Sequence, residues 1–201
     1  MTSEQTARAA AKADRRQSLL EAAARLFADR GFTSVRLEDL GAACGVSGPA
    51  VYRHFPGKTA VLGELLLQVS QDLLDGAHRV AGAEDGAREA LAALVRFQTD
   101  FALSHRDVIA VQGREMRHLE PDVRAEVVRL QRDYIEVWAG QLRLLHPDED
   151  HGTAVFRTQA ALGLVNSTPH SVRRSPSEQR GRRTLLEGMA LSALLAGSEA
   201  R

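Results

Sequence analysis

The segment GVSGPAVYRHFPGK, residues 45–58, decides how this chain folds. Gly45 permits a tight turn, and two short stretches of helical periodicity flank it. Ser47 supplies a hydroxyl that can cap the second helix, and Pro49 suits a first turn where no N–H is needed. Pro56 and the glycine after it end that helix. The spacing predicts a helix-turn-helix, whose second helix can lie in a DNA major groove.

The second helix of this motif has two different faces. Val51 and Phe55 are four residues apart, so we expect both to be buried. The opposite face suits double-stranded DNA, because its small residues can approach base edges while Tyr52, His54 and Lys58 can reach phosphates. The residues on this face are Gly48, Pro49, Ala50, Tyr52, Arg53 and His54.

The rest of the chain also has helical periodicity, and no stretch alternates at period two, which predicts an all-α fold. Gly31 is expected to end the first helix. The spacing of Ser175 and Glu178 matches a capping box at the start of the last one. The expected helices are 12–29, 37–44, a short helix after Ser47, 58–81, 84–104, 106–118, 121–145, 149–168 and 176–197.

The composition is that of a globular protein with zero formal net charge. Residues 1–60 carry nine Arg and Lys against six Asp and Glu, which favours an anionic partner for this part only. No apolar run approaches the roughly 20 residues that span a bilayer, and the N-terminus lacks an apolar leader. We therefore expect a cytoplasmic protein that does not enter a membrane. The single Cys44 is expected to be a buried structural thiol.

Residues 31–62, GFTSVRLEDLGAACGVSGPAVYRHFPGKTAVL, resemble the DNA-binding signature of the TetR family of transcriptional regulators. The shared features are Gly-Phe after helix one, a Val-Ser turn, and a Tyr-x-His-Phe recognition helix that runs into a lysine. The resemblance implies a helix-turn-helix domain at 1–57 and an effector-binding and dimerisation domain at 58–201. It implies a homodimeric regulator, most often a repressor, that leaves a palindromic operator when a small molecule binds. It implies no enzymatic activity, cofactor or metal.

Two residues depart from the pattern of that family. Arg36 stands where the family usually has a capping Thr or Ser, so we expect Ser34 to cap the helix and Arg36 to reach a phosphate or the groove. Glu38 stands where many members have Arg, and it either accepts from a cytosine amino group or acts as a first-turn acid. The predicted DNA-contacting set is Ser34, Arg36, Ser47, Gly48, Pro49, Ala50, Tyr52, Arg53, His54 and Lys58. The basic residues Arg8, Lys12, Arg15 and Arg16 either extend this footprint or form a solvated tail.

The resemblance assigns the dimer interface to the last two helices and a ligand cavity to the helices before them. The expected interface residues are Gly163, Leu185, Gly188, Met189 and Leu195. The expected effector-lining residues are Phe97, Phe101, Met116, His118, Tyr134, Trp138, Phe156 and Asn166. Their mixture of aromatic groups with few charges favours a lipophilic or acyl-bearing effector.

Two other functions fit parts of the sequence. A helical enzyme would use His54 or the His146–His151 cluster, although the acids of that cluster also fit the start of a helix. A DNA-binding module would instead have a body that binds only protein partners. The basic run at 171–183 is expected to be an interhelical loop.

Overall fold

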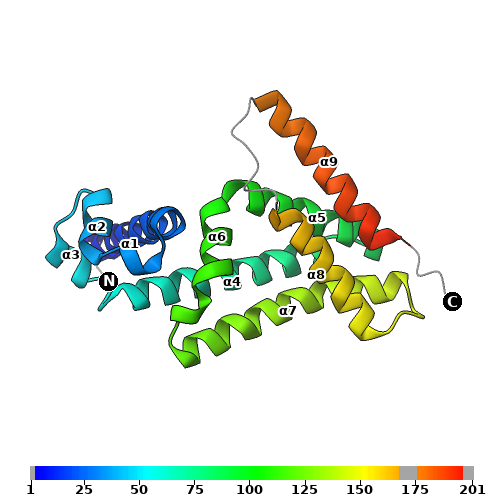
Figure 1. The fold of residues 1–201 in the computed structure, drawn as a ribbon, viewed down its shortest axis with the longest axis horizontal. Coiled ribbons are helices and arrows are strands. Elements are labelled where there is room, and N and C mark those ends of the chain that lie inside the picture. Colours follow the sequence, from blue (N-terminus) through cyan, green and yellow to red (C-terminus); the bar gives the residue numbers. More distant parts are fainter. Residues whose placement is uncertain (1–2, 168–175, 197–201) are drawn as a thin grey trace. The chain divides into compact units, whose positions relative to one another are not determined.

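The computed structural model describes residues 3–167 and 176–196, and its described elements are helical throughout, as the periodicity predicts (Figure 1). In chain order they are α1 (Ser3–Arg30), η1 (Phe32–Ser34), α2 (Leu37–Ala43), α3 (Gly48–Tyr52), α4 (Lys58–Gly82), α5 (Ala87–Ser104), α6 (Arg106–Glu115), η2 (Met116–His118), α7 (Pro121–Leu145), α8 (His151–Ser167) and α9 (Pro176–Leu195).

Several helix ends differ from the prediction. Helix α1 begins at Ser3 rather than near residue 12, because the Ala-rich stretch before Lys12 has high helix propensity although it lacks an apolar face. Helix α8 begins at His151, after the side chain of Asp150 caps it. The predicted capping box at Ser175 lies outside the residues whose side chains the structure describes.

The chain divides into two compact units, of which the first comprises Met1–Val69 and Asp107–Val127. Its core joins the apolar face of α1 to α2, α3 and the first turns of α4. Gly31 has φ of 77° and ends α1, as predicted. Leu26 is only half-buried, whereas the other apolar residues of that face are buried. The largest fully buried side chains of this unit include Leu19, Phe27, Leu40, Phe55, Leu62 and Leu66.

The second unit comprises Ser70–Arg106 and Val128–Arg201. Within it, α5 packs against both α8 and α9, and α8 packs against α9. Its largest fully buried side chains include Trp138, Leu91, Leu94, Leu142 and Leu194. These units describe packing, so the division of functions at residues 57 and 58 stays a prediction.

Candidate functional site

Helices α2 and α3 lie so close together that position 41 of α2 has room only for glycine. The N–H of Val46 donates to the carbonyl of Gly41 at 2.9 Å, and Gly45 turns the chain with φ of 66°. A Cβ atom on Gly41 would lie 2.8 Å from the Val46 oxygen and 3.0 Å from Cγ2 of Val51. The two short helices are therefore held as one rigid pair, which is what a helix-turn-helix requires.

Helix α3 has the two faces that its sequence predicts. Val51 is 0% and Phe55 is 1% exposed, so both anchor the helix in the core. Tyr52 is 52% exposed. Ser47, Pro49 and Arg53 are exposed, and Gly48, Ala50 and His54 are partly exposed. Ser47 is the N-cap residue, but its hydroxyl makes no capping hydrogen bond, contrary to the prediction.

The start of α2 is capped differently from the prediction. Arg36 itself occupies the N-cap position with an extended backbone, two residues beyond Ser34, which ends η1. Its N–H donates to the carboxylate of Asp39 at 2.8 Å. The prediction that Ser34 caps this helix is therefore wrong, and Asp39 supplies the local partner instead. The Arg36 side chain is exposed.

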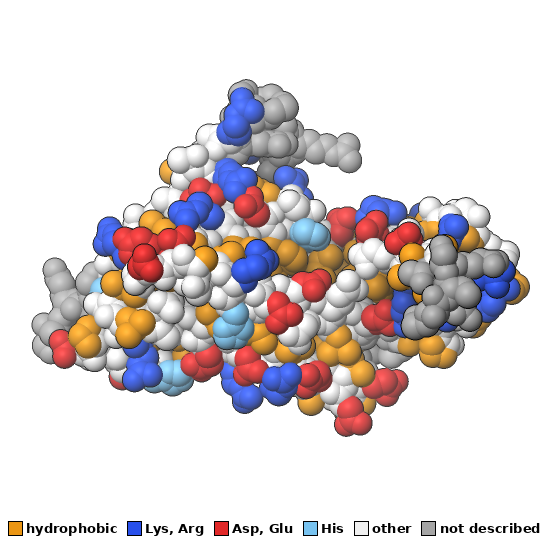
Figure 2. Space-filling view, turned by 180° about the vertical axis from the view of Figure 1, so that it is seen from behind, with side chains coloured by type: hydrophobic (Ala, Val, Ile, Leu, Met, Phe, Trp, Pro, Cys, Tyr) orange, Lys and Arg blue, Asp and Glu red, His pale blue; other side chains and the backbone are white. Residues whose placement is uncertain are grey.

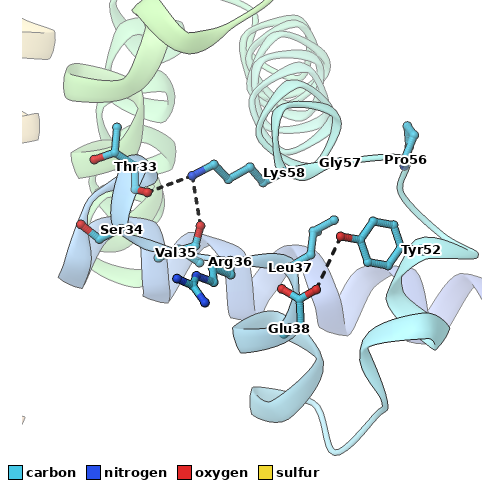
Figure 3. A pocket seen from close by; sticks show the side chains of 10 residues that line it. All are labelled: Thr33, Ser34, Val35, Arg36, Leu37, Glu38, Tyr52, Pro56, Gly57 and Lys58. Carbon is cyan, nitrogen blue, oxygen red and sulfur yellow. Dashed lines mark hydrogen bonds between the residues drawn. The ribbon is translucent and has the colours of Figure 1, made fainter.

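Glu38 lies between the start of α2 and the exposed face of α3. The hydroxyl of Tyr52 donates to Oε1 of Glu38 at 3.5 Å, and a Cβ atom on Gly48 would be 3.3 Å from Cγ of Glu38. Figure 3 shows this pair at the edge of a surface hollow of about 590 Å³. The same hollow brings together four of the predicted DNA-contacting residues, Ser34, Arg36, Tyr52 and Lys58.

Lys58 makes contacts that leave no proton of its ammonium group for a phosphate. Its Nζ donates to the carbonyl oxygens of Phe32, Thr33 and Val35 at 2.9, 3.0 and 3.1 Å. It also lies 4.6 Å from the centre of the Phe32 ring, within the range of a cation–π contact. An ammonium group has three donors, so in this geometry backbone carbonyls engage all of them. Lys58 instead ties η1 to the start of α4 (Figure 3).

Replacing Lys58 with methionine tests this structural role, because methionine keeps the apolar stem and removes the charge. We expect Lys58→Met to lower the free energy of unfolding by about 1.5–3 kcal/mol in chemical denaturation, as the loss of hydrogen bonds from a charged donor predicts. The matched variant Arg53→Met removes an exposed charge and should leave that free energy unchanged. A Lys58→Met protein as stable as the wild type would contradict the assignment.

Arg16 fastens the end of the recognition helix to α1 and α4. Its guanidinium pairs with the carboxylate of Glu64 through Nε and Nη2, and Nη1 donates to the carbonyl of His54. The guanidinium carbon also lies 4.2 Å from the centre of the Phe55 ring. Arg16 is therefore a positioning residue within the unit, although its sequence context equally allowed a solvated side chain.

His54 is held in a desolvated and positively charged environment. Its Nδ1 is buried without a hydrogen-bond partner. Burial, followed by the nearby Lys12 and Arg16 cations and then Arg53 and Arg15, lowers the pKa of His54 below its ordinary value. The imidazole is therefore biased toward its neutral form, which disfavours His54 as a source of positive charge for DNA.

Two of the predicted effector-lining residues, Met116 and His118, belong to the first unit, whereas the other six belong to the second. The His118 ring stacks on Phe32 with centroids 4.8 Å apart, and its Nε2 lies 3.5 Å from Oε2 of the buried Glu115. The Phe32 N–H donates to Oε1 of Glu115 at 3.3 Å. Met116 is half-buried in the same short helix, η2. His118 thus packs around η1, a role that the sequence did not predict.

Three of the predicted effector-lining residues meet in a buried polar cluster of the second unit. The hydroxyl of Tyr134 donates to Oε1 of Gln98 at 2.6 Å, and Nε2 of Gln98 donates to Oδ1 of Asn166 at 2.8 Å. Trp138 packs edge-on against Tyr134 with centroids 6.1 Å apart, and its Nε1 is buried without a partner. Burial raises the pKa of Tyr134, so its hydroxyl stays protonated. Sequence reasoning missed Gln98, the polar residue in this cluster that links α7 to α8.

The remaining three effector candidates differ in position. The ring of Phe97 lies so close to Gly76 that a Cβ atom there would be 2.2 Å from it, and Phe101 stacks on His105 at 4.7 Å. Both phenylalanines are half-buried. Phe156 is 69% exposed on α8, so the prediction that it points inward is wrong.

The predicted dimer residues lie on the outer face of α8 and α9. Leu185 is 63% and Met189 is 48% exposed, and both line an open groove of about 870 Å³ together with Gly188. Gly163 and Gly188 have open space where a side chain would be. Leu195 is half-buried. The core contacts of α9 come from a different face, made by Leu186, Ala190 and Leu194.

Three side chains of the His146–His151 cluster engage separate partners, whereas Nε2 of His146 is buried without one. Thr153 donates to Asp150 through its N–H at 3.1 Å and its hydroxyl at 2.6 Å, and these bonds lower the pKa of Asp150. His151 Nε2 lies 3.3 Å from Glu136, and Glu149 pairs with Arg157 at 2.5 Å. Among the described residues no group of histidines, cysteines and acids is placed to hold a metal ion.

Comparisons with known proteins match both parts of the chain. A family model described as bacterial regulatory proteins of the tetR family matches residues 19–65, and a tetracyclin repressor-like C-terminal domain matches 84–170. The transcriptional repressor KstR2 of Rhodococcus jostii strain RHA1 is 29% identical over 132 residues, which is 65% of this chain and 65% of that protein. The matched stretch thus spans slightly less than two thirds of this relative.

Solved structures share the fold. A TetR-family regulator from Bordetella parapertussis aligns with a TM-score of 0.81 at 23% identity, covering 90% of this chain and 94% of that one. FadR from Bacillus subtilis, solved in complex with stearoyl-CoA, aligns with a TM-score of 0.72 at 16% identity, covering 91% and 99%. In the described part of the chain, no helix has the length and apolar character needed to cross a membrane. The chain belongs to the TetR family of DNA-binding transcriptional regulators, which are not enzymes.

Proposed function

We propose that this protein is a cytoplasmic, ligand-responsive repressor. It binds a palindromic operator as a homodimer, and a small lipophilic or acyl-bearing effector releases it. The observation that carries the proposal is the pairing of a rigid, exposed α3 with a second unit whose α9 keeps large apolar side chains at its surface. One short recognition helix reads too few base pairs to be selective, so the proposal needs two copies.

Base reading is assigned to the N-terminal end of α3. Gly48, Pro49 and Ala50 have small side chains there, and such residues allow the helix to approach base edges and thymine methyl groups. Tyr52, Arg36 and Arg53 are exposed and can reach phosphate oxygens. The Lys58 ammonium is left out of this set because three carbonyl oxygens already occupy it.

Dimerisation is assigned to the outer face of α9, with Leu185, Gly188 and Met189 at its centre. These residues follow one another at helical spacing and lie away from the buried Leu186 and Ala190. Exposed leucine and methionine on a helix that already has a buried face mark an interaction surface. A partner helix packed there would bury both side chains.

Effector binding is assigned to the second unit, around Tyr134, Gln98 and Asn166. The Trp138 Nε1–H makes no well-formed hydrogen bond, since the neighbouring Tyr134 hydroxyl is engaged with Gln98, and a ligand oxygen would satisfy it. Phe97 and Phe101 supply half-buried aromatic surface on α5. The relative bound to stearoyl-CoA supports an acyl-bearing effector, and the KstR2 relative supports repression.

Selection from a randomised pool of duplexes, followed by gel-shift titration, tests the DNA-binding part. We expect the selected sequences to contain an inverted repeat and the complex to contain two protomers. Long-chain acyl-CoAs and free fatty acids are then added to that complex. An effector should raise the melting temperature of the protein, because it binds the folded state, and should release the DNA. Absence of any shifted band at low salt would contradict the proposal.

A further inference from the structure

Helix α1 carries a row of basic residues on one side of its first half. At 3.6 residues per turn, Arg8, Lys12, Arg15 and Arg16 fall within an arc of about 100°. The same arc continues along the helix as the buried Leu19 and the other apolar residues of the core face. The basic row therefore points to the side of α1 on which α3 and α4 pack, and it lies beyond the end of that core.

The contacts of Arg16 fix this row beside the recognition helix. Arg16 donates to the carbonyl of His54, which follows α3 directly. Lys12 lies one turn before Arg16 on the same side of α1, and Arg15 lies next to Arg16 in the sequence. Lys12, Arg15 and Arg53 are all close enough to His54 to depress its pKa. Figure 2 shows lysine and arginine side chains gathered over these N-terminal elements.

Acidic groups do not neutralise Lys12, Arg15 and Arg53. Asp14 and Glu21 fall on the opposite side of α1, about 160–200° from Lys12. The carboxylate of Glu64, which packs against the same side, is already paired with Arg16. Over residues 7–167 and 180–196, where side chains are described, Lys12, Arg15 and Arg53 form no ion pair. Three exposed cations therefore lie together without counter-charges.

We propose that Lys12, Arg15 and Arg53 form a second phosphate-binding surface, which holds the DNA backbone next to the base pairs read by α3. This surface, the α1 basic row with Arg53, rests on the proposed function. Exposed Lys and Arg side chains on a helix flank suit the repeating charge of the backbone, whereas base reading needs side chains aimed into the groove. It contributes affinity and salt dependence, and it does not select the sequence.

The salt dependence of binding tests this surface with two duplexes from the same selection. The long duplex keeps about ten base pairs, or one helical turn, on each side of the inverted repeat. The short duplex ends where the inverted repeat ends. For Lys12→Gln/Arg15→Gln on the long duplex, the plot of log affinity against log salt should become shallower by about 1.8 per protomer, or 0.9 per lost contact. On the short duplex the variant and the wild type should have equal slopes.

Two control variants make the outcome specific. Arg25→Gln removes an exposed charge from the opposite side of α1 and should leave the slope unchanged. Lys12→Arg/Arg15→Lys keeps both charges and should also keep the wild-type slope. Equal slopes for the wild type and Lys12→Gln/Arg15→Gln on the long duplex would overturn the inference. Failure of the proposed function looks different, because the wild type itself would then bind neither duplex.

Discussion

Replacing Leu185 and Met189 with glutamate should convert the protein into a folded monomer that binds its operator roughly 100-fold more weakly, or worse. Both side chains are about half exposed or more on α9, and neither supports the core of its own unit. In the proposed dimer each side chain would be buried, and this burial would stabilise the dimer by about 1.5–3 kcal/mol per side chain. Four glutamates facing one another would remove that gain and add repulsion between desolvated charges.

The loss of DNA affinity follows from separating the two recognition helices. In a dimer, binding of one half-site makes binding of the second intramolecular, and this avidity typically contributes factors of 10² to 10⁴. Sedimentation velocity should give the mass of one protomer for Leu185→Glu/Met189→Glu and of two for the wild type. The melting temperature of the variant must also be measured, since dimerisation itself stabilises the fold.

Leu144→Glu is the matched control for this experiment. Leu144 is 71% exposed on α7, outside α8 and α9, so the same substitution there should change neither mass nor operator affinity. A Leu185→Glu/Met189→Glu protein that still sediments as a dimer would show that the interface lies elsewhere. If Leu144→Glu alone became monomeric, the interface would have to be assigned to α7.

The features that sequence predicted well are those set by local spacing. Val51 and Phe55 are buried because two apolar residues four positions apart lie on the same face of a helix, and that face packs against the core. Gly31 ends α1 because glycine accepts the positive φ that this stop requires. Each of these predictions depends on residues within one or two turns of each other.

The features that sequence missed depend on residues far apart in the chain. Nothing in the sequence places the carbonyls of residues 32–35 around the ammonium group of Lys58. The inward position predicted for Phe156 is wrong because α8 has small or apolar residues nearly all round, so that periodicity does not define its buried side. Gln98 did carry a signal, as a polar residue on the apolar side of α5 with Leu91 and Leu94.

Removing Arg157 should cause the largest loss of stability of any substitution considered for the second unit. Its guanidinium pairs with Glu149 at 2.5 Å, and the Glu149 side chain is only 2% exposed. The other carboxylate oxygen of Glu149 is buried without a partner. Arg157→Ala therefore leaves a desolvated charge uncompensated, which costs about 3–5 kcal/mol in the free energy of unfolding. Arg143→Ala, on the exposed side of α7, should be nearly neutral.

Arg157 has a second role that a double substitution separates from the first. Its Nη2 donates to the carbonyls of Ala193 and Leu194 in the last turn of α9, at 3.2 and 2.6 Å, and also to that of Ala196 just after the helix. Arg157→Met/Glu149→Leu replaces the ion pair with apolar groups and should recover most of the lost stability. It does not restore the bonds to the last turn of α9.

Hydrogen exchange of the α9 amides distinguishes these two roles. The double variant should unfold near the wild-type denaturant midpoint yet exchange faster over residues 190–196, because the last turn of α9 frays without its donor. The proposed dimer face is centred on Leu185 and Met189, which precede the frayed turn of α9. The dimer dissociation constant of the double variant should therefore rise only modestly. If Arg157→Ala unfolds at the wild-type midpoint, the buried pair contributes nothing and the helix-end contacts alone explain the position of Arg157.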